Sequence, residues 1–142
     1  MRAYRDEVAT DDDPDVRLAL GICLLKLGLF DLATEHITAA IADDVDNAEA
    51  FLYAAIAALG GKRPFQVPIA NVKRALEYLD AARMLEDRGI FDYLSGLIRQ
   101  DFFERKYLRI SPTSAEEMSA ARLHNVTQAD IQFVHNLARI PT

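Results

Sequence analysis

The chain has 142 residues, 51% of them hydrophobic, and a formal net charge of −6. This length suits one domain with a substantial core. The acidic balance argues against nucleic acid as a partner, because such binding depends on neutralising phosphates. No apolar run approaches the roughly 20 residues that span a bilayer, and no signal-peptide pattern opens the chain, so we expect a cytoplasmic protein without membrane contact.

The first helix is predicted directly after residues 1–12, which are polar and which we interpret as an N-terminal tail or linker. Asp13 can cap free amide groups, and proline fits the first helical position. Helical spacing then gives two apolar lines, one formed by Val16, Leu20, Cys23, Leu24 and Leu27 and the other by Leu18, Ile22 and Leu25. A helix that is apolar on two faces needs cover on both, so we expect it to be internal and Cys23 to be buried.

The second helix, residues 31–42, is expected to fold back on the first as an antiparallel hairpin. Gly28 is well placed to end the first helix in a left-handed conformation. Small residues, Gly21 on the first helix and Ala33 and Ala40 on the second, would let the two helices approach closely. The inward line of the second helix is predicted to be Leu32, Ala33, Ile37, Ala40 and Ile41.

A second pair of helices is predicted at 48–59 and 71–86, with aspartates and Asn47 supplying turn and cap chemistry before it. Asn71 is the expected cap of the later helix, and Met84 and Leu85 are expected on its buried side. Between the two helices, Pro64 and Pro68 forbid a regular helix. This connecting loop either clips onto the core or overhangs a groove, and the residues that would do so are Lys62, Arg63, Phe65 and Val67.

Three more helices are predicted in the rest of the chain. The first, about 90–106, has a broad apolar surface, but we expect no matching second helix to pair with it. Thr113 with Glu116 and Thr127 with Asp130 make capping patterns that start the last two helices, residues 114–125 and 127–140. We expect residues 111–142 to form a helical pair that packs on the domain formed by residues 13–110.

The first hairpin resembles a tetratricopeptide repeat. The residues that carry the resemblance are Leu20-Gly21, Gly28, Phe30, Ala33 and Ala40, and the segment 44–51 is similar to the family's junction between repeats. Ala75, Leu79 and Ala82 repeat the spacing of Ala33, Ile37 and Ala40. The expected fold is therefore all-α, with about two repeat-like antiparallel hairpins, a C-terminal helical cap and six or seven helices.

The resemblance implies a concave groove lined by the first helix of each hairpin, which binds peptides or helices. By position, the groove would present Asp15, Leu18, Ile22, Leu25, Glu49, Leu52, Ile56 and Leu59. Most of these side chains are apolar, so an amphipathic helix of another protein is one expected occupant. The chain's own C-terminal helices, or a second copy in a homo-oligomer, are the others.

Motifs that would carry catalysis are missing from the sequence. Histidines 36, 124 and 135 show no metal-ligand spacing, Cys23 has no second cysteine, and there is no phosphate-binding glycine loop. We therefore predict no catalytic residues, no metal and no cofactor.

The leading hypothesis is a non-catalytic protein–protein interaction or scaffold module, which could be one domain of a larger protein. One alternative is a DNA-binding regulator that uses residues 126–140, although no recognition helix follows them. Others are a structural or oligomerisation domain whose groove is filled by the chain itself, and a small enzyme with a site under the 62–69 loop.

Overall fold

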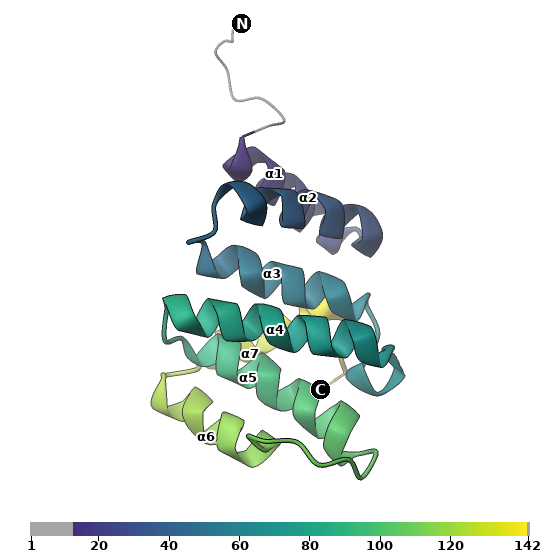
Figure 1. Cartoon of the computed structure of the whole chain (residues 1–142), viewed down its shortest axis with the longest axis vertical. Coiled ribbons are helices and arrows are strands. Elements are labelled where there is room, and N and C mark those ends of the chain that lie inside the picture. The colour runs from purple at the N-terminus through teal and green to yellow at the C-terminus, as the bar shows by residue number, and fades with distance from the viewer. Residues whose placement is uncertain (1–12, 142) are drawn as a thin grey trace, which may run out of the picture.

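The computed structural model describes residues 13–141, and these residues form helices and connecting loops without any strand. Figure 1 shows the helices stacked along the long axis of the molecule. Their bounds are α1 Pro14–Lys26, α2 Phe30–Asp43, α3 Ala48–Leu59, α4 Ile69–Leu85, α5 Gly89–Ile98, α6 Ser114–Leu123 and α7 Gln128–Ala138. The expectation of an all-α fold with six or seven helices is confirmed.

Consecutive helices pack in three pairs: α1 with α2, α3 with α4, and α5 with α6. Contacts between α2 and α3, and between α4 and α5, join each pair to the next. The expectation that the 90–106 helix has no partner is therefore wrong, because α6 packs along α5. The last helix, α7, contacts α5 and α3 and lies behind α4 in the view of Figure 1.

Most helix starts are formed as the sequence predicts. The Asp13 carboxylate accepts a hydrogen bond from the amide of Asp15, and Asn47 does the same for Ala50 at the start of α3. Thr113 and Thr127 form complete capping boxes with Glu116 and Asp130.

The start of α4 differs from the prediction. Pro68 occupies the cap position, and the helix begins at Ile69 rather than at Asn71. Proline has no N–H and its ring presets the backbone angle, so it fits the entry to a helix. The Asn71 side chain instead donates a hydrogen bond to the carbonyl oxygen of Ala58, which ties α4 to α3.

The close approach of α1 and α2 is confirmed at Gly21, which is buried. A Cβ atom there would collide with Cγ1 of Ile37 and would lie 3.4 Å from the carbonyl oxygen of Ala33. Gly28 has the left-handed conformation expected of a residue that ends a helix, with φ of 81°.

The expectation that the first helix is internal is wrong. α1 packs on α2 through one face, which contains Gly21 and Leu25, and its opposite face points out of the stack. Cys23 is exposed rather than buried, and Leu27 is 71% exposed. Leu32 on α2, predicted to face inward, is 47% exposed. Periodicity reports an apolar face but does not say whether another element covers it.

The core is densest around α3 and α5. Leu52, Ile56 and Leu59 of α3 and Phe91, Leu94 and Ile98 of α5 are at most 2% exposed. Another expectation fails at the end of α4, where Met84 is 87% exposed and Leu85 is 39% exposed, because the chain leaves the stack there.

No helix among residues 13–141 is both long enough and apolar enough to cross a bilayer.

Candidate interaction surface

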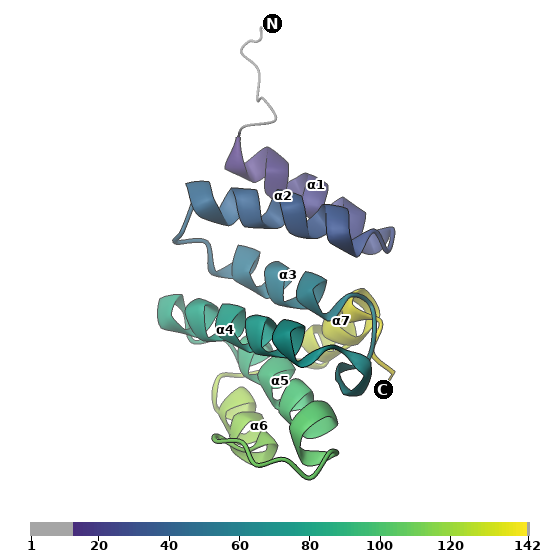
Figure 2. The same ribbon diagram turned by 45° about the vertical axis from the view of Figure 1, so that its right-hand side comes forward.

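The surface of α3 and α5 that faces away from α4 is covered by α7 (Figure 2). The side of α7 that packs on the core carries Val134 and Ala138, both fully buried, and Leu137, which is 8% exposed. Gln132, Asn136 and Arg139 are exposed on its other side. Apolar residues at three- and four-residue spacing on one side, with polar residues opposite, make α7 an amphipathic helix.

A hydrogen-bonded pair joins α7 to α5. The Tyr93 hydroxyl lies 2.7 Å from Nε2 of His135, and Nδ1 of His135 lies 2.9 Å from the carbonyl oxygen of Ile140. A carbonyl oxygen only accepts hydrogen bonds, so Nδ1 carries the proton and donates. In a neutral ring Nε2 then accepts from the tyrosine hydroxyl. Burial raises the pKa of Tyr93, which keeps this donor protonated.

An aromatic pair joins α7 to α3. The rings of Tyr53 and Phe133 meet edge to face, with centroids 6.1 Å apart. Such pairs are worth about 0.5–1.5 kcal/mol beyond the area that they bury. Burial, followed by the nearby charge of Glu49, raises the pKa of Tyr53.

The end of α7 reaches the turn between α1 and α2. Arg139, in a left-handed conformation, places its guanidinium group 5.7 Å from the ring centroid of Phe30. Its Nη2 lies 3.5 Å from the carbonyl oxygen of Lys26, at the end of α1. The last helix therefore contacts residues from all three helical pairs.

The residues predicted to line a groove fall into two groups. Leu25, Leu52, Ile56 and Leu59 are at most 2% exposed and belong to the core. Leu18 and Ile22 are partly exposed, and Asp15 and Glu49 are exposed. The structure thus brings Leu25, Leu52, Leu59 and Ile56 into the packed interior, while the carboxylates of Asp15 and Glu49 lie at the surface.

The loop between α3 and α4 is held by contacts of Arg63 and Phe65 with Asp101. It contains a 3-10 turn, Pro64–Gln66, and its backbone amide at Phe65 donates a 2.8 Å hydrogen bond to Asp101. Arg63 forms an ion pair with the same carboxylate. Burial works to raise the pKa of Asp101, but the hydrogen bonds and charge of its partners outweigh it and lower that pKa.

Asp101 lies in a π-helical segment, Arg99–Glu104, that continues α5. Of the four loop residues singled out from the sequence, Val67 is buried, Arg63 is partly exposed, and Lys62 and Phe65 are exposed. A cleft of about 340 Å³ under the loop is lined by Phe30, Leu59, Lys62, Val67 and Asn71, among others. Its described lining contains no histidine, serine or cysteine, and its charged side chains are Asp31 and Lys62.

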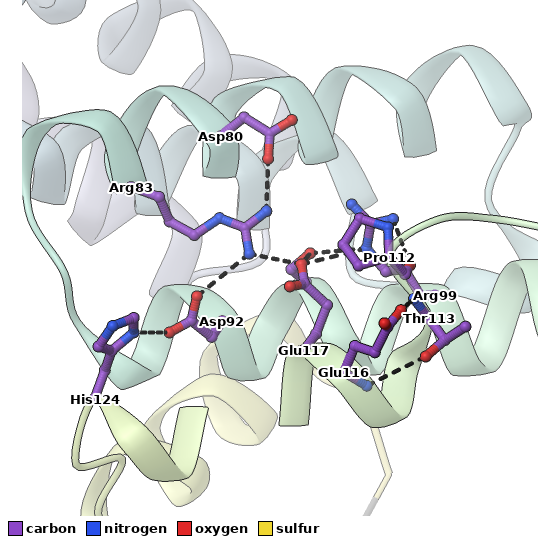
Figure 3. A network of polar contacts seen from close by, with 10 residues as sticks. Asp80, Arg83, Asp92, Arg99, Pro112, Thr113, Glu116, Glu117 and His124 are labelled. Carbon is purple, nitrogen blue, oxygen red and sulfur yellow. Dashed lines mark hydrogen bonds and ion pairs between the residues drawn. The ribbon is translucent and has the colours of Figure 1, made fainter. Parts of the chain in front are cut away.

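A buried polar network joins α4, α5 and α6 (Figure 3). Arg83 of α4 lies 2.6 Å from Glu117 of α6 and 3.3 Å from Asp92 of α5. Glu117 also accepts a hydrogen bond from Ser95, and Asp92 lies 2.6 Å from Nδ1 of His124. Burial alone would lower the pKa of Arg83, but its carboxylate partners outweigh burial and raise that pKa above its ordinary value.

The polar groups of the network pair with one another and so link the three helices. Ser95 donates its proton to Glu117, and the charge of that carboxylate is matched by Arg83 and Arg99. Arg99 is held by Ser95 and by the carbonyl oxygen of Pro112, and its charge faces Glu117 at 3.4 Å. No cluster of histidine, cysteine and carboxylate side chains suited to a metal ion occurs within residues 13–141.

Sequence reasoning missed both the Tyr93–His135 pair and this network. Periodicity did carry a weak signal for the network, since Asp92 and Ser95 interrupt the otherwise apolar helix α5 at three-residue spacing. Tyr93 and His135 are 42 positions apart, and nothing local links them.

Comparison with family models, with curated proteins and with solved structures finds no match for this chain.

Proposed function

We propose that this protein is a non-catalytic protein–protein interaction module that binds an amphipathic helix on the surface formed by α3 and α5. The observation that carries the proposal is α7, an amphipathic helix of the chain itself that lies on this surface. The resemblance of the first hairpin to a tetratricopeptide repeat supports it, because that family binds helices on the corresponding side. We place the protein in the cytoplasm and propose no metal or cofactor.

The contacts of α7 define the kind of partner that the surface would accept. A partner helix would carry apolar residues at the spacing of Val134, Leu137 and Ala138. An aromatic residue in the place of Phe133 would meet Tyr53, and an acceptor in the place of His135 would meet the Tyr93 hydroxyl. In this proposal α7 holds the site until a partner helix competes for it.

Competition of this kind depends on how tightly α7 is held. A tethered helix binds at a high effective concentration, on the order of millimolar, so a free helix must have higher intrinsic affinity to displace it. The described contacts between α7 and the rest of the chain are apolar contacts, edge-to-face ring pairs, the contact of Arg139 with the Phe30 ring, and a few neutral or exposed hydrogen bonds. The buried ion pairs lie between α4, α5 and α6 instead.

The test uses the whole folded chain with a protease site inserted between Val126 and Thr127, in the turn before α7. After cleavage α7 is no longer tethered, and a labelled peptide of residues 127–142 is added. We expect it to bind the cut protein, with the uncut protein binding at least about tenfold more weakly because of the tether. Fluorescence anisotropy measures both affinities.

A matched control peptide carries Val134→Asp, which places a charge at a fully buried position and should not bind. The proposal fails if the cut protein retains α7 without exchange, or if it loses its helical circular dichroism as α7 leaves. Either result would make α7 a permanent part of the core and the protein a structural domain.

The DNA-binding alternative is not retained, because the apolar side of the 126–140 segment is buried and the net charge is −6.

A further inference from the structure

The outward face of α1, together with Leu27 in the cap position at its end, forms an apolar strip of Val16, Leu20, Cys23 and Leu27. Leu20 is 40% exposed and Leu27 is 71% exposed, Cys23 is exposed, and Val16 is partly exposed. The strip lies on the side of α1 opposite Gly21 and Leu25, which pack against α2. An apolar strip on an end helix differs from the polar outer surface that stacked helical proteins need for solubility.

The spacing of the strip indicates what covers it. Its members follow one another by four, three and four positions, which is the a and d pattern of a helix that packs along another helix. The strip runs from Val16 to Leu27, about three helical turns, so it matches a helix of similar length. α1 itself has 13 residues.

We propose that the occupant is a second copy of this chain, with the two α1 helices antiparallel about a two-fold axis. In this register Leu20 lies opposite the partner subunit's Cys23, and Val16 opposite the partner subunit's Leu27. The strip is then complementary to itself, as an interface with two-fold symmetry requires.

Charge favours this arrangement over other pairings of the same strip. Asp15 and Lys26 are both exposed and lie on the same flank of the strip, at opposite ends of α1. An antiparallel pair places Asp15 beside the partner subunit's Lys26, and the symmetry repeats this ion pair. A parallel pair would bring both Asp15 side chains to one end and both Lys26 side chains to the other, so neither would meet a partner of opposite charge. Opposed helix dipoles favour the antiparallel pair as well.

The size of the strip sets the strength of the association. Two helices of this length bury less than the about 1,600 Å² of a standard interface, so we expect a dissociation constant on the order of 10 μM. The surface on α3 and α5 that is proposed to bind a partner helix lies elsewhere in the stack. Dimerisation and helix binding are therefore separable, and the failure of one does not decide the other.

Sedimentation velocity of the whole chain over a concentration series tests the proposal. We expect a monomer at about 1 μM and mostly dimer at about 200 μM. Leu20→Glu should weaken the dimer at least about tenfold, because it places a charge in the centre of the strip. Leu123→Glu is the matched control, since Leu123 is 76% exposed near the end of α6 and outside the strip. A wild type that stays monomeric, or equal effects of the two variants, would overturn the proposal.

Charge reversal tests the antiparallel register. Asp15→Lys alone and Lys26→Asp alone should each weaken the dimer about three- to tenfold, and the double variant should restore it, since both ion pairs re-form with reversed sign. A double variant no better than the singles would rule out this register. A further variant that lacks residues 1–12 tests the competing occupant: if only the shortened chain dimerises, the chain's own start covers the strip and the proposal is wrong.

Discussion

The first and the third helical pairs are built by different means. α1 and α2 meet through small and aliphatic residues, Gly21, Leu25, Ala33 and Ile37, and the outer face of α1 is open. α5, by contrast, is packed by α4, α6 and α7 and buries charged side chains as well as apolar ones. The difference shows that position in the stack, rather than the apolar content of a helix, decides how much of it is buried.

The largest expected effect is in α5. Phe91→Ala removes a side chain that is fully buried and should lower the free energy of unfolding by about 3–5 kcal/mol. Leu27→Ala, in the first pair, should change it by less than about 0.5 kcal/mol, because Leu27 is 71% exposed. Urea unfolding at about 1 μM protein, where the proposed dimer is dissociated, measures both. Equal effects would refute the comparison.

The second effect concerns the buried charges between α4, α5 and α6. Glu117→Gln removes the carboxylate shared by Arg83, Ser95 and Arg99 and should cost about 3 kcal/mol of stability, because it leaves buried positive charge uncompensated. The same change at the exposed residue Glu77 should cost less than about 0.5 kcal/mol. Thermal unfolding by circular dichroism separates the two. A Glu117 variant as stable as the Glu77 variant would mean that the network contributes no net stability.

The third effect tests how closely α1 and α2 approach each other at Gly21. Gly21→Ala should destabilise the protein by about 1–3 kcal/mol, because the new methyl group overlaps Ile37. The overlap predicts coupling: in an Ile37→Ala background the same substitution should cost less than it does alone. A double-mutant cycle measured by chemical denaturation provides the test, and simple additivity would show that α1 and α2 do not approach closely at this point.

The smallest effect is a pH dependence at the end of α6. The hydrogen bond that His124 donates to the carboxylate of Asp92 raises the pKa of His124 above its ordinary value. The protonated histidine therefore stabilises the folded state fully below its ordinary pKa of about 6.5, and this contribution is lost as the pH rises through the raised value. The stability difference between wild type and His124→Gln should shrink over that range. A difference independent of pH would show that the ion pair does not form.

The sequence predicted the helices well because their signals are local. Asp13, Asn47, Thr113 and Thr127 cap helices within three residues of themselves, and the chemistry of a cap is complete in such a short segment. Gly28 is a local signal in the same sense. Pro68 instead of Asn71 as the cap of α4 shows that even local signals compete.

Features that depend on contacts between distant residues could not be predicted from the sequence. Nothing in the local sequence distinguishes the covered Leu25 from the exposed Leu27, because the difference lies in whether another helix packs there. Asp92 and Glu117 are buried against the usual preference of carboxylates, since Arg83 of α4 reaches them. The pair Tyr93–His135, which joins α7 to the candidate surface, spans 42 positions.

The path of α7 has a consequence for how this chain folds during synthesis. Each helical pair is made of neighbouring segments and can form as soon as it emerges, since its contacts are local. The surface of α3 and α5, in contrast, is covered only by a helix that is translated after all the others. At about 5–20 residues per second, α3 is exposed for several seconds before residues 128–138 follow. A nascent chain thus presents this apolar surface to chaperones, or to a partner helix, before its own α7 exists to compete.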